Sequence, residues 1–204
     1  MALALVAFSL AACEADHDDH DHDHDNEIIS QVVLTFTPVD GGDPLIFAFD
    51  DPDGDGGVSG VSDRIELTAG TQYDLAITLA NSLVDPAEDL TGEIEGEAEE
   101  HMIFIVGDVV GPASASTTAL VSQSYADLES TYGDNAVGED LPVGLRHTVE
   151  AMEAGDGTFR VLLRHLPAIN DVPQKTGDLP ADLAAGRDLP GSVDVDLSFD
   201  LRVS

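Results

Sequence analysis

The sequence contains one cysteine, no tryptophan and few aromatic residues, which make up 5% of the chain. With Cys13 as the only thiol, neither an intramolecular disulfide nor a cluster of cysteine ligands for a metal can form. The core must therefore be built from aliphatic side chains and seven phenylalanines. A hydrophobic content of 43% in 204 residues is sufficient for one globular domain.

Basic residues are also scarce: seven Lys and Arg stand against 41 Asp and Glu, which gives a net charge of −34. Nucleic acid and anionic lipid surfaces are recognised through Lys and Arg, so this charge excludes both as partners of a basic patch. Strong self-repulsion is typical of halophilic proteins, whose acidic surface is screened by salt. Calcium loading is the alternative explanation of the acidity.

Long hydrophobic runs are missing, since no stretch approaches the roughly 18 apolar residues that a transmembrane helix needs. The chain begins instead with a short apolar segment that ends in Leu10-Ala11-Ala12-Cys13. A short apolar run that ends in small residues before a cysteine is typical of a lipoprotein signal, with cleavage before Cys13 and a lipid on its thiol. No Lys or Arg precedes the apolar run, although a secretory signal usually starts with a positive region, so the true start lies upstream or the chain is truncated.

We therefore expect three parts: a signal peptide (residues 1–12), a lipidated cysteine with a flexible leash (residues 13–27), and a single domain (residues 28–204). Glu14 follows the cysteine and differs from an aspartate inner-membrane retention signal. This favours an outer-membrane lipoprotein on the periplasmic or the surface face.

The leash alternates acid and imidazole and contains four of the seven histidines. Imidazole favours zinc, copper and nickel, and a flexible chain can wrap one ion with two or three rings. The surrounding aspartates favour protonated histidine, which competes with the metal below neutral pH. The tract predicts zinc or copper binding, whereas the alternative is an inert hydrophilic spacer. The predicted ligands are His17, His20, His22 and His24.

Alternating apolar and polar residues and frequent turn signals predict about nine strands and no long helix in the domain. This pattern is typical of an all-β fold, an antiparallel β-sandwich of the Ig-like or jelly-roll-like kind, with a closed barrel as the alternative. Residues 88–100 predict a short acidic helix or loop, and residues 170–191 a long surface loop. The predicted strands are 31–37, 45–49, 64–67, 73–79, 101–106, 118–125, 145–152, 158–165 and 193–203.

One acidic loop resembles the first half of an EF-hand calcium loop, because it repeats Asp at every second position and ends in glycine. The second half is missing, since position twelve of the loop is Ser62. A plain Asp-Gly turn is the alternative. The candidate calcium ligands are Asp51, Asp53 and Asp55.

A second candidate metal site comes from the predicted strands 145–152 and 158–165, read as a hairpin over Gly155-Asp156-Gly157. Matching their apolar faces places His147 opposite His165, close enough for both rings to bind one zinc. His101, at the start of a strand beside Glu97 and Glu100, is the candidate third ligand. Core histidines with ordinary hydrogen bonds are the alternative.

Enzyme signatures are absent from the sequence, which has no His-Glu-x-x-His, no Gly-x-Ser-x-Gly and no phosphate-binding Gly-rich loop. We therefore predict that the protein is not an enzyme.

Seven short segments carry a resemblance to known proteins: residues 34–38, 51–57, 88–94, 99–101, 142–145, 163–165 and the terminal strand. They resemble a family of small, largely uncharacterised bacterial envelope lipoproteins that often neighbour TonB-dependent receptors. The chain differs from the family pattern at Met102-Ile103, where Gln and Phe are usual, and at Leu166, where an acid is usual. Members are sometimes labelled as having a type 1 periplasmic-binding fold, which alternates helices with parallel strands, and this strand pattern does not. The resemblance implies an envelope lipoprotein with a role in receptor-linked uptake.

Together these features predict a lipid-anchored extracytoplasmic protein that binds a divalent metal, accessory to an outer-membrane uptake receptor. The alternative is a structural or adhesive surface module of a high-salt organism, with an inert spacer.

Overall fold

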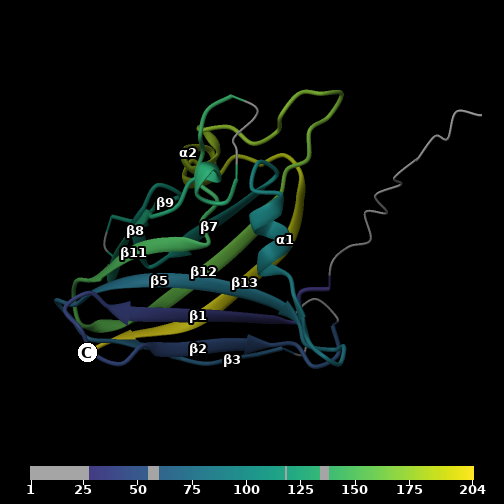
Figure 1. The fold of residues 1–204 in the computed structure, drawn as a ribbon. Coiled ribbons are helices and arrows are strands. Elements are labelled where there is room, and N and C mark those ends of the chain that lie inside the picture. Colours follow the sequence, from purple (N-terminus) through teal and green to yellow (C-terminus); the bar gives the residue numbers. More distant parts are fainter. Residues whose placement is uncertain (1–27, 55–59, 118, 134–137) are drawn as a thin grey trace, which may run out of the picture.

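The computed structural model describes residues 28–54, 60–117, 119–133 and 138–204 of the chain. Two β-sheets face each other and enclose the main hydrophobic core (Figure 1). The predicted all-β sandwich is confirmed. Two of the strand pairings are parallel, β8 (Val109–Gly111) with β10 (Val121–Tyr125) and β4 (Ile65–Leu67) with β13 (Ser192–Val203). The other pairings between the described strands are antiparallel.

The larger sheet has nine strands in the order β3-β2-β1-β5-β11-β10-β8-β9, with β6 paired to β5. Its first two long strands form a hairpin, in which Gln31 pairs with Asp50 and Phe36 with Leu45. The strands are β1 (Gln31–Pro38), β2 (Leu45–Asp50), β3 (Val61–Ser62), β5 (Gln72–Asn81), β6 (Glu88–Asp89), β8 (Val109–Gly111), β9 (Ser114–Ala115), β10 (Val121–Tyr125) and β11 (Arg146–Ala151).

The smaller sheet has four strands in the order β4-β13-β12-β7. Its two long central strands run side by side from the pair Gly155–Val203 to the pair His165–Ser192, with a bulge after Leu163. The strands are β4 (Ile65–Leu67), β7 (His101–Gly107), β12 (Gly155–His165) and β13 (Ser192–Val203).

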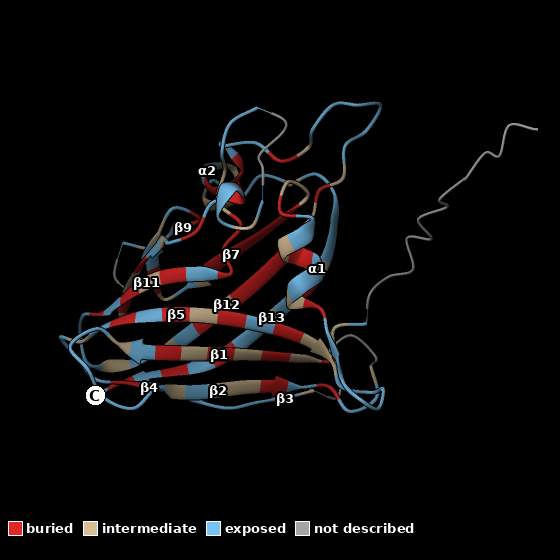
Figure 2. Cartoon of the chain, viewed as in Figure 1, coloured by how far each residue is buried: buried red, intermediate tan, exposed pale blue. Residues whose placement is uncertain are grey.

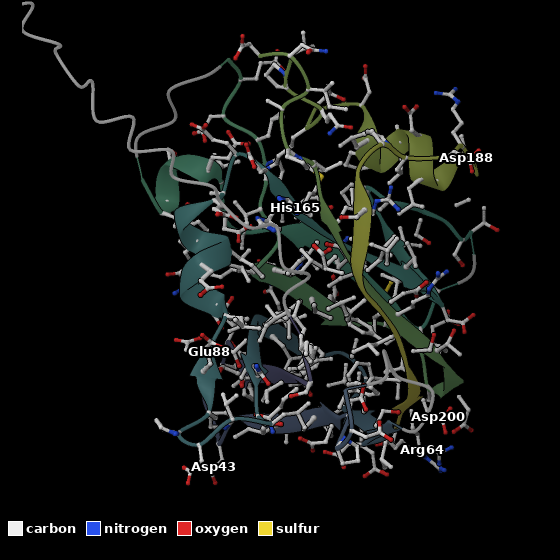
Figure 3. The ribbon with its side chains drawn as sticks, turned by 90° about the vertical axis from the view of Figure 1, so that its right-hand side faces the viewer. Asp43, Arg64, Glu88, His165, Asp188 and Asp200 are labelled. Carbon is white, nitrogen blue, oxygen red and sulfur yellow. The ribbon has the colours of Figure 1, made fainter. Side chains whose placement is uncertain are left out.

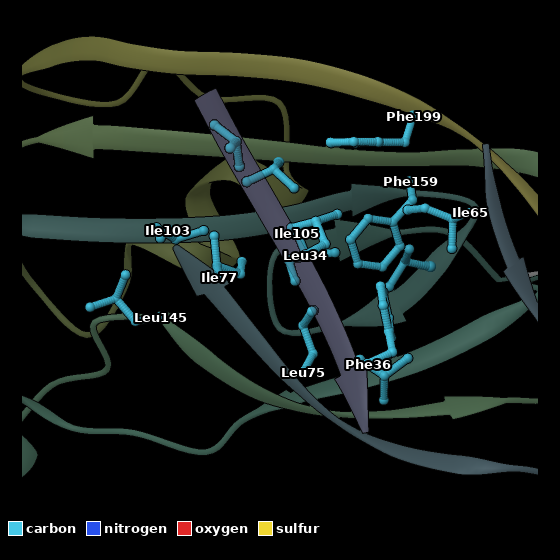
Figure 4. Packing of buried hydrophobic residues seen from close by; sticks show 14 of the residues in the cluster. Leu34, Phe36, Ile65, Leu75, Ile77, Ile103, Ile105, Leu145, Phe159 and Phe199 are labelled. Carbon is cyan, nitrogen blue, oxygen red and sulfur yellow. The ribbon is translucent and has the colours of Figure 1, made fainter. Parts of the chain in front are cut away.

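The main core is formed by the inner faces of both sheets, because apolar side chains alternate with exposed polar ones along the strands. Phe36 of the larger sheet makes an edge-to-face contact with Phe159 of the smaller sheet, at 5.9 Å between ring centroids (Figure 4). Figure 2 shows buried positions that alternate with half-buried ones along β1 and mostly with exposed ones along β5.

A second, smaller cluster covers the other face of the smaller sheet. Met102, Phe104 and Leu162 point into it, and helix α2 (Leu179–Ala184) contributes the buried Leu179. Strand β7 is therefore buried on both faces, although it is an edge strand of the smaller sheet. The segment 170–191, predicted to be a long surface loop, contains α2, which packs on the second cluster through Leu179.

The free edge of β7 is covered by the chain before β11. The N–H of Ile103 donates to the carbonyl of Val143 at 2.7 Å, and the Tyr125 hydroxyl donates to the Ile103 carbonyl. Gly144 has a φ of +88°, and a Cβ on it would lie 2.6 Å from the Ile103 carbonyl oxygen. Only glycine fits this close approach without displacing the edge.

Residues 88–100, predicted to form a short acidic helix or loop, contain helix α1 (Thr91–Gly96). This helix leads into β7 at one end of the sandwich. Its Thr91 hydroxyl accepts the N–H of Leu79 at 2.9 Å, and Ile94 is buried in the main core. The 3-10 turn η1 (Glu129–Thr131) lies between β10 and β11. The placement of α1 fixes where the turn before His101 enters the sheet.

Candidate metal centre

Two histidines lie side by side at one end of the smaller sheet. His101, the first residue of β7, pairs directly with His165, the last residue of β12. Directly paired side chains share a face of the sheet, and here that face is the inner one, since Ile103 and Leu163 of the same strands point into the main core. The two rings are stacked with 4.6 Å between centroids and 8° between planes. Figure 3 shows His165 well away from Arg64 and Asp200.

A carboxylate from the turn after α1 completes a candidate ligand set. Glu97 Oε2 lies 3.8 Å from His101 Nδ1. Glu97, His101 and His165 can each offer one ligand atom, and these atoms all lie within 4.8 Å of one another. Two imidazoles and a carboxylate form a donor set that suits zinc and other divalent transition metals.

A second carboxylate faces the other ring edge of His101. Asp194 Oδ2 lies 4.0 Å from His101 Nε2. His101 Nδ1 donates to the Glu97 carbonyl oxygen at 3.2 Å, so in the neutral ring the lone pair is on Nε2, the edge that faces Asp194. An ion at Nε2 would lie beside Asp194, whereas an ion shared by Glu97 and Nδ1 would have to replace this hydrogen bond.

The surroundings keep His101 neutral. Burial is the main cause that lowers its pKa below the usual value of 6.5, and the neighbouring His165 lowers it further. The Glu97 carbonyl, Asp194 and Glu100 act in the opposite direction and do not reverse the shift. A neutral imidazole is the form that binds a metal, so the lowered pKa reduces competition from protons near neutral pH.

The stacked arrangement cannot hold one ion on both rings. The lone pairs of an imidazole lie in the plane of its ring, and one ion cannot lie in two parallel planes at once. Binding to both rings therefore requires one of them to turn. His165 is the more exposed of the two, since its side chain is 24% exposed and that of His101 is 4% exposed.

The predicted pairing of His147 with His165 is wrong. Strand β11 pairs with β5 and β10 in the larger sheet, whereas β12 pairs with β7 and β13 in the smaller one. The chain crosses between the sheets after Ala151, so the two strands face each other across the core and do not form a hairpin. The structure brings His165 together with His101 and leaves His147 apart in the other sheet.

His147 has a hydrogen-bonding partner at each ring nitrogen. Its Nε2 donates to the Gly144 carbonyl at 2.8 Å, and its Nδ1 lies 3.0 Å from Gln123 Oε1. Gln123 Nε2 is buried without a hydrogen-bond partner in the structure. If the Gln123 amide is turned by half a turn, its NH2 group donates to Nδ1 of His147, and both of these groups then have a hydrogen-bond partner. Burial lowers the pKa of His147 to about 4, so this histidine is neutral and structural.

Other predicted site residues lie elsewhere. Cys13, the four leash histidines and Asp55 are outside the described residues. Asp51 is buried, and its Oδ1 accepts the N–H of Gly54 at 3.2 Å, which is the contact expected of an Asp-Gly turn. Asp53 is exposed in the same turn, and calcium binding there stays a prediction.

The sequence did not reveal the part played by Asp194. It lies at the bulge where Leu163 pairs with Val195 and Arg164 with Val193. A strict alternation would point Asp194 to solvent, and the bulge redirects it toward His101. No sequence signal marks this bulge.

Comparison with family models, with curated proteins and with solved structures found no match to the chain. Among the described residues, no helix has the length and apolar character needed to cross a membrane.

Proposed function

We propose that this protein is a lipid-anchored envelope protein that binds a divalent transition-metal ion, with zinc or copper as the cargo, at His101, His165 and Glu97. The observation that carries the proposal is the direct cross-strand pairing of the two histidines beside the Glu97 carboxylate, with ligand atoms within 4.8 Å of one another. The neutral state of His101 supports it further.

The leash histidines extend the proposal. Their tract collects ions near the membrane, and the folded centre holds one ion in a fixed geometry. The lipid on Cys13 keeps both close to an outer-membrane uptake receptor. This part depends on the sequence motifs alone, because residues 1–27 are outside the described part of the chain.

Titration calorimetry with zinc can separate the two classes of site in the full chain, with Cys13→Ser in every variant to prevent lipidation. Replacing His17, His20, His22 and His24 by Ser should leave one zinc bound. Adding His165→Asn to that chain should weaken the remaining site by about 100-fold or more, because one of its two imidazoles is lost.

Two carboxylate variants identify the third ligand. Glu97→Gln tests whether the carboxylate grouped with the two histidines is the third ligand. Asp194→Asn tests whether the ligand is instead the carboxylate that faces His101 Nε2. Glu93→Gln is the matched control, since Glu93 is exposed on α1, the helix directly before Glu97, and its replacement removes the same charge. Zinc affinity that is unchanged by His165→Asn would refute the centre. A full chain that binds no zinc would favour the structural or adhesive module of a high-salt organism.

A further inference from the structure

A cavity of about 470 Å³ opens beside the second hydrophobic cluster, next to the end of β12. Its walls come from residues 138–141, from η1 and from the loop that follows β12, the yellow-green segment at the top of Figure 1. Pockets for small organic ligands typically hold about 300–1,000 Å³. The volume is therefore suited to a small molecule.

One part of the cavity wall is apolar. Leu141, Leu166, Ala168 and Pro173 line it, and Leu166 is buried in the second cluster. A bare metal ion would leave this wall unused, whereas an aliphatic group would be removed from water there. The wall therefore favours an organic ligand.

The only lysine of the chain also lines the cavity, and its charge is already matched. Lys175 Nζ lies 2.8 Å from Glu129 Oε1, and both side chains are buried. The same ammonium donates to the Ala98 carbonyl at 2.7 Å. These contacts of Lys175 connect the loop after β12 to η1 and to the turn before β7. The buried ion pair therefore forms a polar part of the cavity wall.

The other charged side chains at the cavity are acidic: Glu99, Glu100, Glu139 and Asp171. Since Lys175 is paired with Glu129, the cavity as a whole attracts cations and repels anions. A carboxylate or phosphate ligand would meet four like charges there and a single lysine that already has a carboxylate partner.

We propose that this cavity binds a primary aliphatic amine in its ammonium form, with the alkyl chain on the apolar wall and the head group among the carboxylates. This site is distinct from the metal centre and does not depend on it. Glu100 is common to both neighbourhoods, because its Oε2 lies 3.7 Å from His165 Nε2. The amine site is therefore best tested with a chelator present.

Three probes with the same alkyl body separate the contributions of charge and chain: n-hexylammonium, n-hexanol and n-hexanoate. Calorimetry on the full chain with EDTA, at about 0.15 M salt to screen distant charges, should show hexylammonium binding at least about tenfold more tightly than hexanol. Hexanoate should not bind. Hexanol or hexanoate binding as tightly as hexylammonium would overturn the proposal.

Two variants locate the site. Ala168→Trp places a large ring in the cavity at an exposed position and should abolish binding, whereas Glu139→Gln should weaken it about tenfold by removing one carboxylate. Glu150→Gln, at an exposed position of β11, removes the same charge far from the cavity lining and should leave the affinity unchanged. Thermal melts of each variant establish that it is folded. Full-strength binding to folded Ala168→Trp, or equal loss in Glu150→Gln and Glu139→Gln, would overturn the proposal.

Discussion

His147 and the His101–His165 pair lie on facing sheets of one sandwich, and both are reached by strands that alternate in the same way. At His147 the protein supplies a partner for each ring nitrogen, and burial excludes water. In the His101–His165 pair, the His165 ring is partly exposed. The carboxylates of Glu97, Glu100 and Asp194 lie within 4.0 Å of ring nitrogens of this pair. A histidine enclosed by hydrogen-bond partners acts as a core residue, whereas one that faces carboxylates at an open end can bind an ion.

Replacing His147 should have the largest effect on stability and none on the metal. His147→Leu leaves the Gly144 carbonyl and the Gln123 amide without their partner, so we expect the free energy of unfolding to fall by about 4 kcal/mol. Urea denaturation measures the loss. Zinc stoichiometry in the folded variant should equal that of the parent chain, and a lost site would place His147 among the ligands.

Acid should destabilise the protein through His147. Its pKa is about 4 in the folded chain and 6.5 in the unfolded chain, so the unfolded chain binds more protons between these values. The stability contribution is complete above pH 6.5 and falls by about 3 kcal/mol as the pH drops toward 4. In His147→Gln the difference in stability from the parent should shrink over that range. A constant difference from pH 7 to pH 4 would show that His147 does not titrate there.

Zinc should stabilise the folded chain by binding to the His101–His165 pair. Binding to the folded state alone adds about 2.7 kcal/mol at a free zinc concentration of 100 times Kd. The test uses the leash-serine chain, in which the four leash histidines are replaced by Ser. Melting curves of this chain with and without zinc should show the gain in stability, and His165→Asn should remove it. A gain that survives in His165→Asn would place the ion elsewhere.

The smallest effect is expected for His165→Asn without metal. The side chain is 24% exposed and stacks on its neighbour, so its loss should change the free energy of unfolding by less than about 1 kcal/mol. Denaturation in EDTA measures it. A loss as large as that of His147→Leu would mean that the pair is built for stability and would weaken the contrast between the two regions.

Much of the fold could be predicted from the sequence, because long alternation specifies both a strand and its buried face. The terminal alternation from Val193 to Val203 became β13, and the run from Tyr73 to Leu79 became the centre of β5. The acidic segment at 88–100 became β6, α1 and the turn that carries Glu97.

The site could be predicted only in part. The sequence placed His101 and His165 at strand ends but could not tell a hairpin from a crossing between sheets. Both connections after Ala151 bury the same faces, so local pattern does not distinguish them. The bulge that turns Asp194 inward and the burial of Lys175 against Glu129 depend on contacts between distant segments.

Anomalous X-ray diffraction at the zinc edge, on crystals of the leash-serine chain grown with zinc, tests the central claim most directly. We expect one anomalous peak within about 2.1 Å of a ring nitrogen of both His101 and His165. The His165 ring should be turned out of the parallel stack, and a carboxylate of Glu97 or Asp194 should lie on the ion. Zinc bound at other residues, with the two rings still stacked, would contradict the account.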